Sequence, residues 1–197
     1  MRRCCMLLLV LWVLAFPSWS GAQGLTDAQY QLLNTDITVT HASEFQPYVD
    51  AADYQQITDR YNSQAAPVFW VWRTQVNAKE IYENTSVDGT TWNWTTYIGQ
   101  SVQERDGWQT MVTPGTINPA LPQVRGAFDK IFSGTGVSAT QRAHLYAISR
   151  RQALRAEALF ANTSAGNGSS ATPANLTYIG NITYKDVNHC LTGAPLN

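Results

Sequence analysis

The sequence predicts a mainly α-helical protein, organised as a single helical domain of about five or six helices with a small extended segment near the C-terminus. Apolar residues recur at three- and four-residue spacing along most of the chain, which is typical of helices that bury one face. Clusters of Pro, Gly, Asn, Ser and Thr separate these periodic segments. Beyond a short N-terminal apolar run, about 175 of the 197 residues remain, enough for one domain with its own core (23–197).

The first 22 residues have the pattern of a secretory signal peptide. A basic start (Arg2, Arg3) precedes an unbroken apolar run at 6–16, and small residues fit a cleavage site directly after Ala22. The run is too short to span a bilayer, which needs about 20 apolar residues. Two interpretations stay open: residues 1–22 are a signal peptide that is removed on export, or they are an upstream extension outside the true protein.

The next part of the chain predicts two helices. Residues 25–33 carry apolar groups on one face, and Thr26 is a candidate N-cap. Residues 36–40 are short and β-branched, so they are either extended or a loop that enters the next helix. A stronger helix is expected at 43–61, where the apolar stripe continues with a small phase slip. An apolar segment follows at 68–73.

The middle of the chain alternates short helices with turns. Residues 78–82 predict a short helical turn, and the polar stretch 84–92 predicts a loop. Residues 94–111 are expected to form another helix. An amphipathic helix is expected at 121–132, with Pro122 in its first turn, where proline is tolerated.

The C-terminal part contains the clearest helix of the chain. Residues 141–161 are periodic throughout and predict the longest, central helix. Residues 162–176 are rich in Ser, Gly, Asn and Thr and predict a flexible loop. A weak pair of strands is expected at 176–183, and a short final helix at 184–191.

The composition argues against a nucleic-acid protein. The net charge is −1 and only 14% of residues are charged, whereas nucleic-acid-binding domains carry a strong basic excess. The chain has seven Trp and nine Tyr, and large amphipathic rings are favoured at protein–protein interfaces. Four tryptophans near polar loops are therefore candidate partner contacts: Trp70, Trp72, Trp92 and Trp94. The alternative is that they build a Trp-rich core.

A cluster of arginines lies on the expected helix at 141–161. Arg151 and Arg155 are four residues apart and would share a face, with Arg150 about 100° away. Such a basic side could pair with acidic groups of a partner subunit or face DNA. The alternative is a solvated helix face with local ion pairs. No aromatic stacking platform is interleaved, so sequence-specific nucleic-acid binding is not expected.

The sequence contains no recognisable catalytic or metal-binding motif. His41, His144 and His189 are isolated, and no spacing of His, Cys or acidic residues matches a known metal site. Beyond residue 22, Cys190 is the only cysteine, so no internal disulfide is possible in 23–197. The sequence therefore predicts a non-enzymatic protein without a cofactor.

Several segments resemble one group of proteins. Residues 25–40 (LTDAQYQLLNTDITVT), 67–74 (PVFWVWRT), 141–161 and 180–187 (GNITYKDV) are similar to small tailed-bacteriophage and prophage proteins encoded among head-morphogenesis genes. The resemblance implies a helical virion protein, a head–tail connector or adaptor that forms a homo-oligomeric ring between capsid portal and tail. Its partners would be portal or tail components, and it would assemble in the host cytoplasm without entering a membrane.

The N-terminus departs from that resemblance. Proteins of this kind need no signal peptide, and the similar region begins at Leu25, whose codon can serve as an alternative bacterial start. If instead the segment before Gln23 is a true signal, the chain is an exported, non-enzymatic helical binding module. Both hypotheses stay open at the level of the sequence.

Overall fold

A computed structural model describes residues 24–196 of the chain, so the signal-like segment and its expected cleavage site lie outside the described residues. Helices dominate residues 24–196, which confirms the mainly α prediction. Ten α-helices are present in this range, more than the five or six expected. The excess arises because three of the expected helices are each divided in two and because the short turn expected at 78–82 is a helix of its own, Ala78–Glu83.

The helices are, in chain order, α1 (Asp27–Thr35), α2 (Ala42–Asp50), α3 (Tyr54–Tyr61), α4 (Ala78–Glu83), α5 (Trp94–Ile98), α6 (Val102–Val112), α7 (Pro122–Ile131), α8 (Val137–Ile148), α9 (Arg155–Phe160) and α10 (Tyr184–Thr192). A π-helical turn, η1 (Asp36–Thr40), joins α1 to α2, and a 3-10 turn, η2 (Thr163–Ala165), follows α9. Two antiparallel pairs of short strands complete the described part: β1 (Trp70–Trp72) with β4 (Arg150–Gln152), and β2 (Val76–Asn77) with β3 (Thr116–Ile117).

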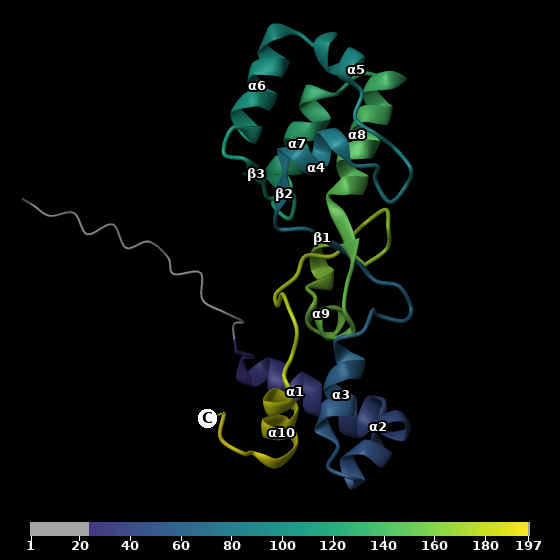
Figure 1. Cartoon of the computed structure of the whole chain (residues 1–197), viewed down its shortest axis with the longest axis vertical. Coiled ribbons are helices and arrows are strands. Elements are labelled where there is room, and N and C mark those ends of the chain that lie inside the picture. The colour runs from purple at the N-terminus through teal and green to yellow at the C-terminus, as the bar shows by residue number, and fades with distance from the viewer. Residues whose placement is uncertain (1–23, 197) are drawn as a thin grey trace, which may run out of the picture.

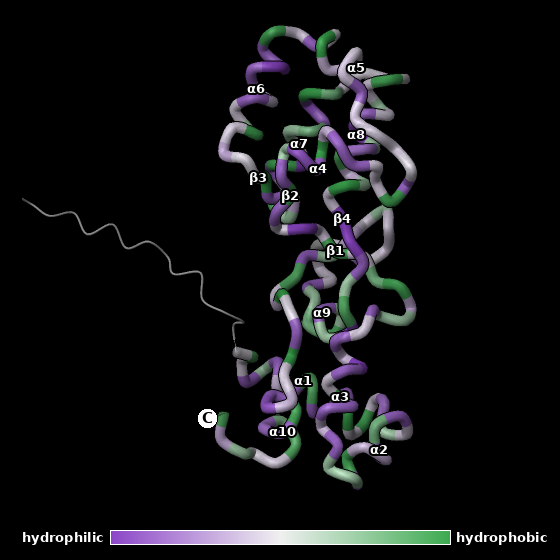
Figure 2. The backbone as a smooth tube through the Cα atoms, viewed as in Figure 1, coloured by the Kyte–Doolittle hydropathy of each residue, from purple (hydrophilic) through white to green (hydrophobic). Residues whose placement is uncertain are grey.

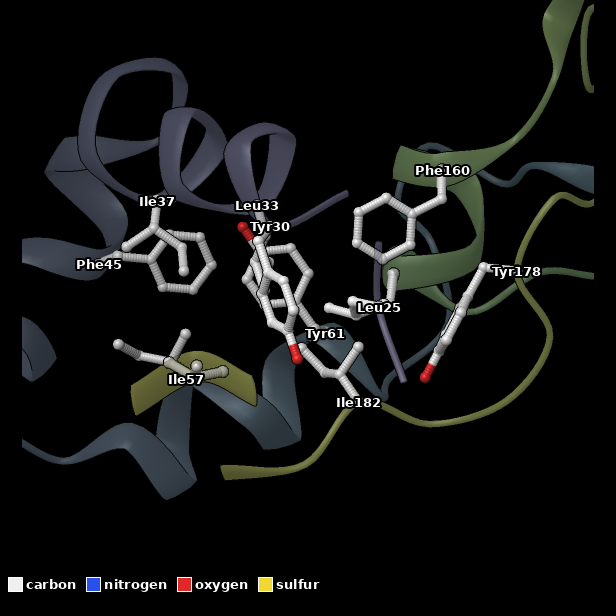
Figure 3. Packing of buried hydrophobic residues seen from close by; sticks show 12 residues of the cluster. Leu25, Tyr30, Leu33, Ile37, Phe45, Ile57, Tyr61, Phe160, Tyr178 and Ile182 are labelled. Carbon is white, nitrogen blue, oxygen red and sulfur yellow. The ribbon is translucent and has the colours of Figure 1, made fainter. Parts of the chain in front are cut away.

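The molecule is elongated and has two lobes (Figure 1). The lower lobe contains α1–α3, α9 and α10, and the upper lobe contains α4–α8. Each lobe buries its own hydrophobic cluster. Figure 3 shows Ile37, Phe45 and Tyr61 gathered in the lower cluster, with Phe160 and Tyr178 on its other side. The upper cluster is built around fully buried aromatic and aliphatic side chains, among them Trp108, Phe128, Phe132 and Leu145.

The lobes are joined by β1 and β4, in register Trp70↔Gln152 and Trp72↔Arg150. The expected loop 162–176 lies against β1. The Trp70 N–H donates to the carbonyl of Gly168 at 2.7 Å, and the Ala174 N–H donates to the carbonyl of Trp70 at 3.0 Å. This loop therefore forms part of the junction between the lobes.

The prediction of one long helix at 141–161 is wrong. α8 ends before Ser149, residues 150–152 form β4, and a new helix, α9, begins at Arg155. The strand β1 presents backbone N–H and C=O groups that a helix could not satisfy, and pairing with β4 satisfies them. Tertiary pairing therefore overrides the helical propensity of this segment.

The expected helices at 43–61 and 94–111 are also divided. The phase slip in the first marks a real break: Ala52 has φ 52°, and the Asp53 side chain accepts the Gln56 N–H to begin α3. In the second, the Ser101 hydroxyl caps a new helix, α6, in a reciprocal capping box. Each break thus has a local side-chain cause.

The remaining expectations have mixed outcomes. Thr26 caps α1, and Pro122 lies in the first turn of α7, as expected. Residues 36–40 are neither extended nor a loop but a π-helical turn. Residues 176–183 do not form the expected strand pair within the described chain. Instead the Asn62 side-chain amide pairs with both backbone groups of Ile182, at 2.9 and 3.0 Å, and takes the place of a partner strand.

Candidate interaction surface

The four candidate tryptophans differ in how far their side chains are exposed. Trp72 and Trp92 are buried, at 6% and 7% exposure, and Trp70 is half-buried at the junction of the lobes. Trp94 is 51% exposed. Trp92 stacks on the fully buried Trp108, with ring centroids 5.1 Å apart, so it belongs to the upper core. Of the four, Trp94 alone combines proximity to a loop with large exposure.

The three candidate arginines do not share a helix face. Arg150 and Arg151 lie on β4, and Arg155 begins α9. The guanidinium of Arg150 binds the carboxylate of Asp88 at 2.5 and 2.6 Å and lies over the ring of Trp70.

Arg151 and Arg155 are equally engaged inside the chain. Arg151 forms two hydrogen bonds of 2.7 Å to the buried carboxylate of Glu157, and Arg155 donates to Glu44 at 2.8 Å. The hypothesis that these arginines bind a partner's carboxylates stays untested. Their partners in the structure, however, lie within this chain.

A different surface stands out at the far end of the upper lobe. Residues 89–103 and 131–141 contain no charged side chain, and these two segments meet there. The Asn93 N–H donates to the Gln141 side chain at 2.8 Å, and the Gln100 side chain reaches Ser138 at 3.5 Å. In Figure 2, hydrophobic segments recur at this end of the tube around α5 and at the start of α8.

Four large apolar side chains project from this end. Their exposed fractions are 51% for Trp94, 63% for Ile98, 58% for Val102 and 63% for Val137. We call this set the apolar end. Exposed apolar side chains on segments without charged residues are typical of the centre of a protein–protein interface. The sequence already carried this signal in the two uncharged segments, but no periodicity identified which residues are exposed.

The apolar end is held by specific contacts. The Asn93 side chain caps α5 through the Thr96 N–H at 2.9 Å, which fixes the helix that carries Trp94 and Ile98. The Trp94 ring packs beside Tyr82 and Tyr97, with ring centroids 5.0 and 6.0 Å away. These contacts orient the exposed indole before any partner binds, and such pre-organisation reduces the entropy lost on association.

One charged group reaches the apolar end, where the Arg105 guanidinium donates to the Ile98 carbonyl at 3.4 Å. Burial raises the pKa of Tyr82, which also accepts a hydrogen bond from the Trp108 indole at 2.9 Å, so this phenol is uncharged at neutral pH. Hydrogen bonds from the Ser101 hydroxyl and backbone N–H lower the pKa of Glu104, the first charged residue after the uncharged segment. A shallow cavity of about 260 Å³ lies between α5 and the start of α8, beside Val137.

Other chemistry is sparse in the described chain. Within residues 24–196, no group of three or more His, Cys, Asp or Glu side chains is arranged to hold a metal ion. Burial raises the pKa of Cys190 to about 11, which leaves it a poorly nucleophilic thiol at neutral pH. None of the helices in residues 24–196 is long and apolar enough to cross a membrane. One titratable pair, Asp36 with His41, borders a cavity in the lower lobe.

Comparison of the chain with models of known protein families, with curated proteins and with solved structures finds no match.

Proposed function

We propose that this protein is a non-enzymatic structural component of a tailed-phage particle, a head–tail connector or adaptor that forms a homo-oligomeric ring between the capsid portal and the tail. The resemblance of several segments to phage head-morphogenesis proteins supports the class of protein. The observation that carries the association is the apolar end: four exposed apolar side chains on two uncharged segments.

The occupant we assign to the apolar end is a second copy of this chain. A closed ring requires heterologous contacts, in which one surface of each copy meets a different surface of the next. The apolar end lies at one extremity of an elongated molecule, so it can reach a neighbour without displacing either core (Figure 1). Arginine pairing is not needed for this contact, because Arg150, Arg151 and Arg155 already have partners within the chain.

Self-association can be tested by sedimentation of the purified protein over a wide concentration range. Wild type is expected to form oligomers that dissociate on dilution. Ile98→Glu and Val137→Glu should shift the protein to monomer, because each places a charge in a contact that excludes water. Val39→Glu is the matched control: Val39 is 71% exposed but lies on η1 in the lower lobe. A wild type that stays monomeric at all concentrations, or a control that disrupts assembly equally, would contradict the assignment.

The place of the protein in a particle needs a separate experiment. In cells that produce the phage, the protein should co-sediment with heads that carry portal or tail components, and Ile98→Glu should remain in the soluble fraction while Val39→Glu co-sediments. Absence of the wild-type protein from all particle fractions would contradict the connector proposal even if it self-associates.

The alternative, an exported helical binding module, is favoured by the signal-like pattern at 1–22. Mass spectrometry of the native N-terminus separates the two proposals. A first residue of Gln23 would indicate export, whereas a Met in the place of Leu25 would indicate a cytoplasmic protein and support assembly in the host cell.

A further inference from the structure

The lower lobe contains a cavity of about 500 Å³ that the assembly proposal does not use. One wall is polar and comprises Asp36, His41, Glu44 and Arg155. The other is apolar and is formed by residues 65–67, by Phe69 and by α9, including Leu159. A cavity of this size with apolar walls and a few convergent polar groups is typical of a small-molecule site.

The π-helical turn creates the polar wall. In an α-helix, residues five apart point about 140° away from each other. In η1 the His41 N–H donates to the Asp36 carbonyl at 2.8 Å, which closes the wider turn and brings the two side chains together. Nδ1 of His41 then lies 2.8 Å from Oδ1 of Asp36. Single π-turns of this kind occur frequently at functional sites.

The hydrogen bonds of Asp36 determine what His41 can offer. A carboxylate only accepts hydrogen bonds, so Nδ1 of His41 carries the proton. The other carboxylate oxygen accepts the hydroxyl of the buried Tyr61 at 2.6 Å. Burial and this bond raise the pKa of Tyr61, which keeps it a donor. Asp36 is therefore satisfied within the chain, and its bond to Nδ1 fixes the orientation of the His41 ring.

The remaining ring nitrogen of His41 is available to a ligand. Nε2 has no hydrogen-bond partner within residues 24–196, and the side chain is 46% exposed. With the proton on Nδ1, Nε2 is a hydrogen-bond acceptor in the neutral ring. Nε2 of His41 is thus the open hydrogen-bond acceptor of the polar wall, and the matching group on a ligand is a hydrogen-bond donor.

The charged groups of the wall are paired with one another. Glu44 accepts from Arg155 at 2.8 Å and from Arg60 at 3.1 Å, and these bonds, led by that from Arg155, lower its pKa. The Arg155 guanidinium also lies 4.8 Å from the ring centroid of Phe45, which fixes its position. The carboxylates of Asp36 and Glu44 both pair with the Arg155 guanidinium of the wall, and Glu44 pairs also with Arg60 outside it, so the wall offers an ionic ligand no unpaired charge.

We propose that this cavity binds a small, neutral, apolar alcohol or phenol, whose hydroxyl donates a hydrogen bond to Nε2 of His41 and whose body lies against Phe69 and Leu159. The proposal is independent of the assembly function, because it rests on the lower lobe alone. An apolar body suits the wall formed by residues 65–67, Phe69 and α9, and a single hydroxyl satisfies the one open acceptor.

The test compares ligands that differ in the donor. p-Cresol and 4-methylanisole have similar size, but the second cannot donate a hydrogen bond. In NMR titrations at about pH 8, where histidine side chains are generally neutral, p-cresol should bind at least tenfold more tightly and shift the Nε2 resonance of His41. Equal binding of the two compounds, or no binding of p-cresol up to about 10 mM, would overturn the proposal. So would tighter binding of the anion 4-methylbenzoate.

Variants locate the contact. In His41→Phe, p-cresol and 4-methylanisole should bind equally and weakly, because the acceptor is lost and the cavity remains. Leu159→Trp should fill the cavity and abolish binding of both. His189→Phe is the matched histidine control: His189 lies on α10, its Nδ1 is bonded to the Ala194 carbonyl beyond the end of that helix, and the variant should bind p-cresol as wild type does. Retained tenfold selectivity in a folded His41→Phe protein would exclude His41 as the acceptor.

Discussion

Glu157→Gln should destabilise the protein strongly, because it removes the charge from a buried and fully bonded carboxylate. The Glu157 side chain is 2% exposed. It accepts two hydrogen bonds of 2.7 Å from Arg151 and further bonds from the backbone N–H groups of Leu154, at 3.0 Å, and Gly180, at 3.2 Å. One side chain thereby ties β4, the start of α9 and the segment before α10 together.

The size of the effect follows from what each substitution leaves behind. Breaking a buried ion pair costs about 3–5 kcal/mol. Glu157→Gln leaves Arg151, whose side chain is 36% exposed and can be rehydrated, so we expect the lower end, about 3 kcal/mol. Arg151→Met leaves a buried carboxylate without its cation and should cost more, about 4–5 kcal/mol. The double variant should cost less than the sum, because the two side chains share one interaction.

The pH dependence gives an independent check of the same pair. Burial alone would raise the pKa of Glu157, but the hydrogen bonds from Arg151 and the backbone outweigh it and hold the pKa below the ordinary value of 4.5. A depressed pKa in the folded state stabilises the protein above the pKa of the unfolded chain. This contribution is lost as the pH falls below 4.5 and through the pKa of the folded state. Since Gln does not titrate, the stability difference between wild type and Glu157→Gln should shrink in that range.

The measurement is urea denaturation followed by tryptophan fluorescence and circular dichroism, at several pH values. Glu83→Gln is the control, because Glu83 pairs with Lys79 at 3.8 Å on the surface, with side chains 61% and 79% exposed. It should change the free energy of unfolding by no more than about 0.5 kcal/mol. The reasoning is refuted if Glu157→Gln is as harmless as this control, or if its cost is the same at pH 7 and below pH 4 (about the ordinary range of a carboxyl).

Three further changes test other parts of the fold. Ala52→Gly should stabilise the protein by about 0.5–1 kcal/mol in thermal unfolding, because Ala52 has φ 52°, a conformation that glycine adopts without strain; a lower Tm would contradict this. His144→Phe should cost about 1–3 kcal/mol in urea denaturation, because the fully buried ring loses its 2.9 Å bond to the Ile81 carbonyl. An unchanged free energy of unfolding would show that the hydrogen bond between His144 and the Ile81 carbonyl does not stabilise the fold. Gly168→Ala should speed hydrogen exchange of the Trp70 amide, since Gly168 has φ +78° and an added Cβ would lie 2.2 Å from an aromatic carbon; unaltered exchange would mean that the loop stays on β1.

Helix content was predictable from the sequence, whereas helix ends were predictable only where a side chain marks them. The capping box of Ser101 and Glu104 can be recognised in the sequence, because a Ser is followed three residues later by a Glu. The break after Ile148 has no such mark. Residues 150–152 leave the helix because β1 lies beside them, and this partner is about 80 residues away in the chain. Long-range pairing of this kind has no local signature.

The candidate surface was predictable in part. A count of tryptophans cannot separate Trp92, which the upper core buries, from Trp94, which is half exposed two residues later. The absence of charge in 89–103 and 131–141 was visible, but its meaning required the two segments to meet at one end of the lobe. For the arginines, the sequence pattern predicted a surface that the fold does not contain. Their acidic partners Asp88 and Glu44 are distant in sequence, so the basic face seen along a helix does not exist in the folded chain.

The two proposals can be examined independently because of where the lobes join. The apolar end belongs to the upper lobe and the cavity to the lower lobe, each with its own hydrophobic cluster. Substitutions that are far apart and share no partner have additive effects on stability. Ile98→Glu should therefore leave phenol binding unchanged, and His41→Phe should leave assembly unchanged. If ligand binding does alter assembly, the coupling has to cross β1, β4 and the loop on β1.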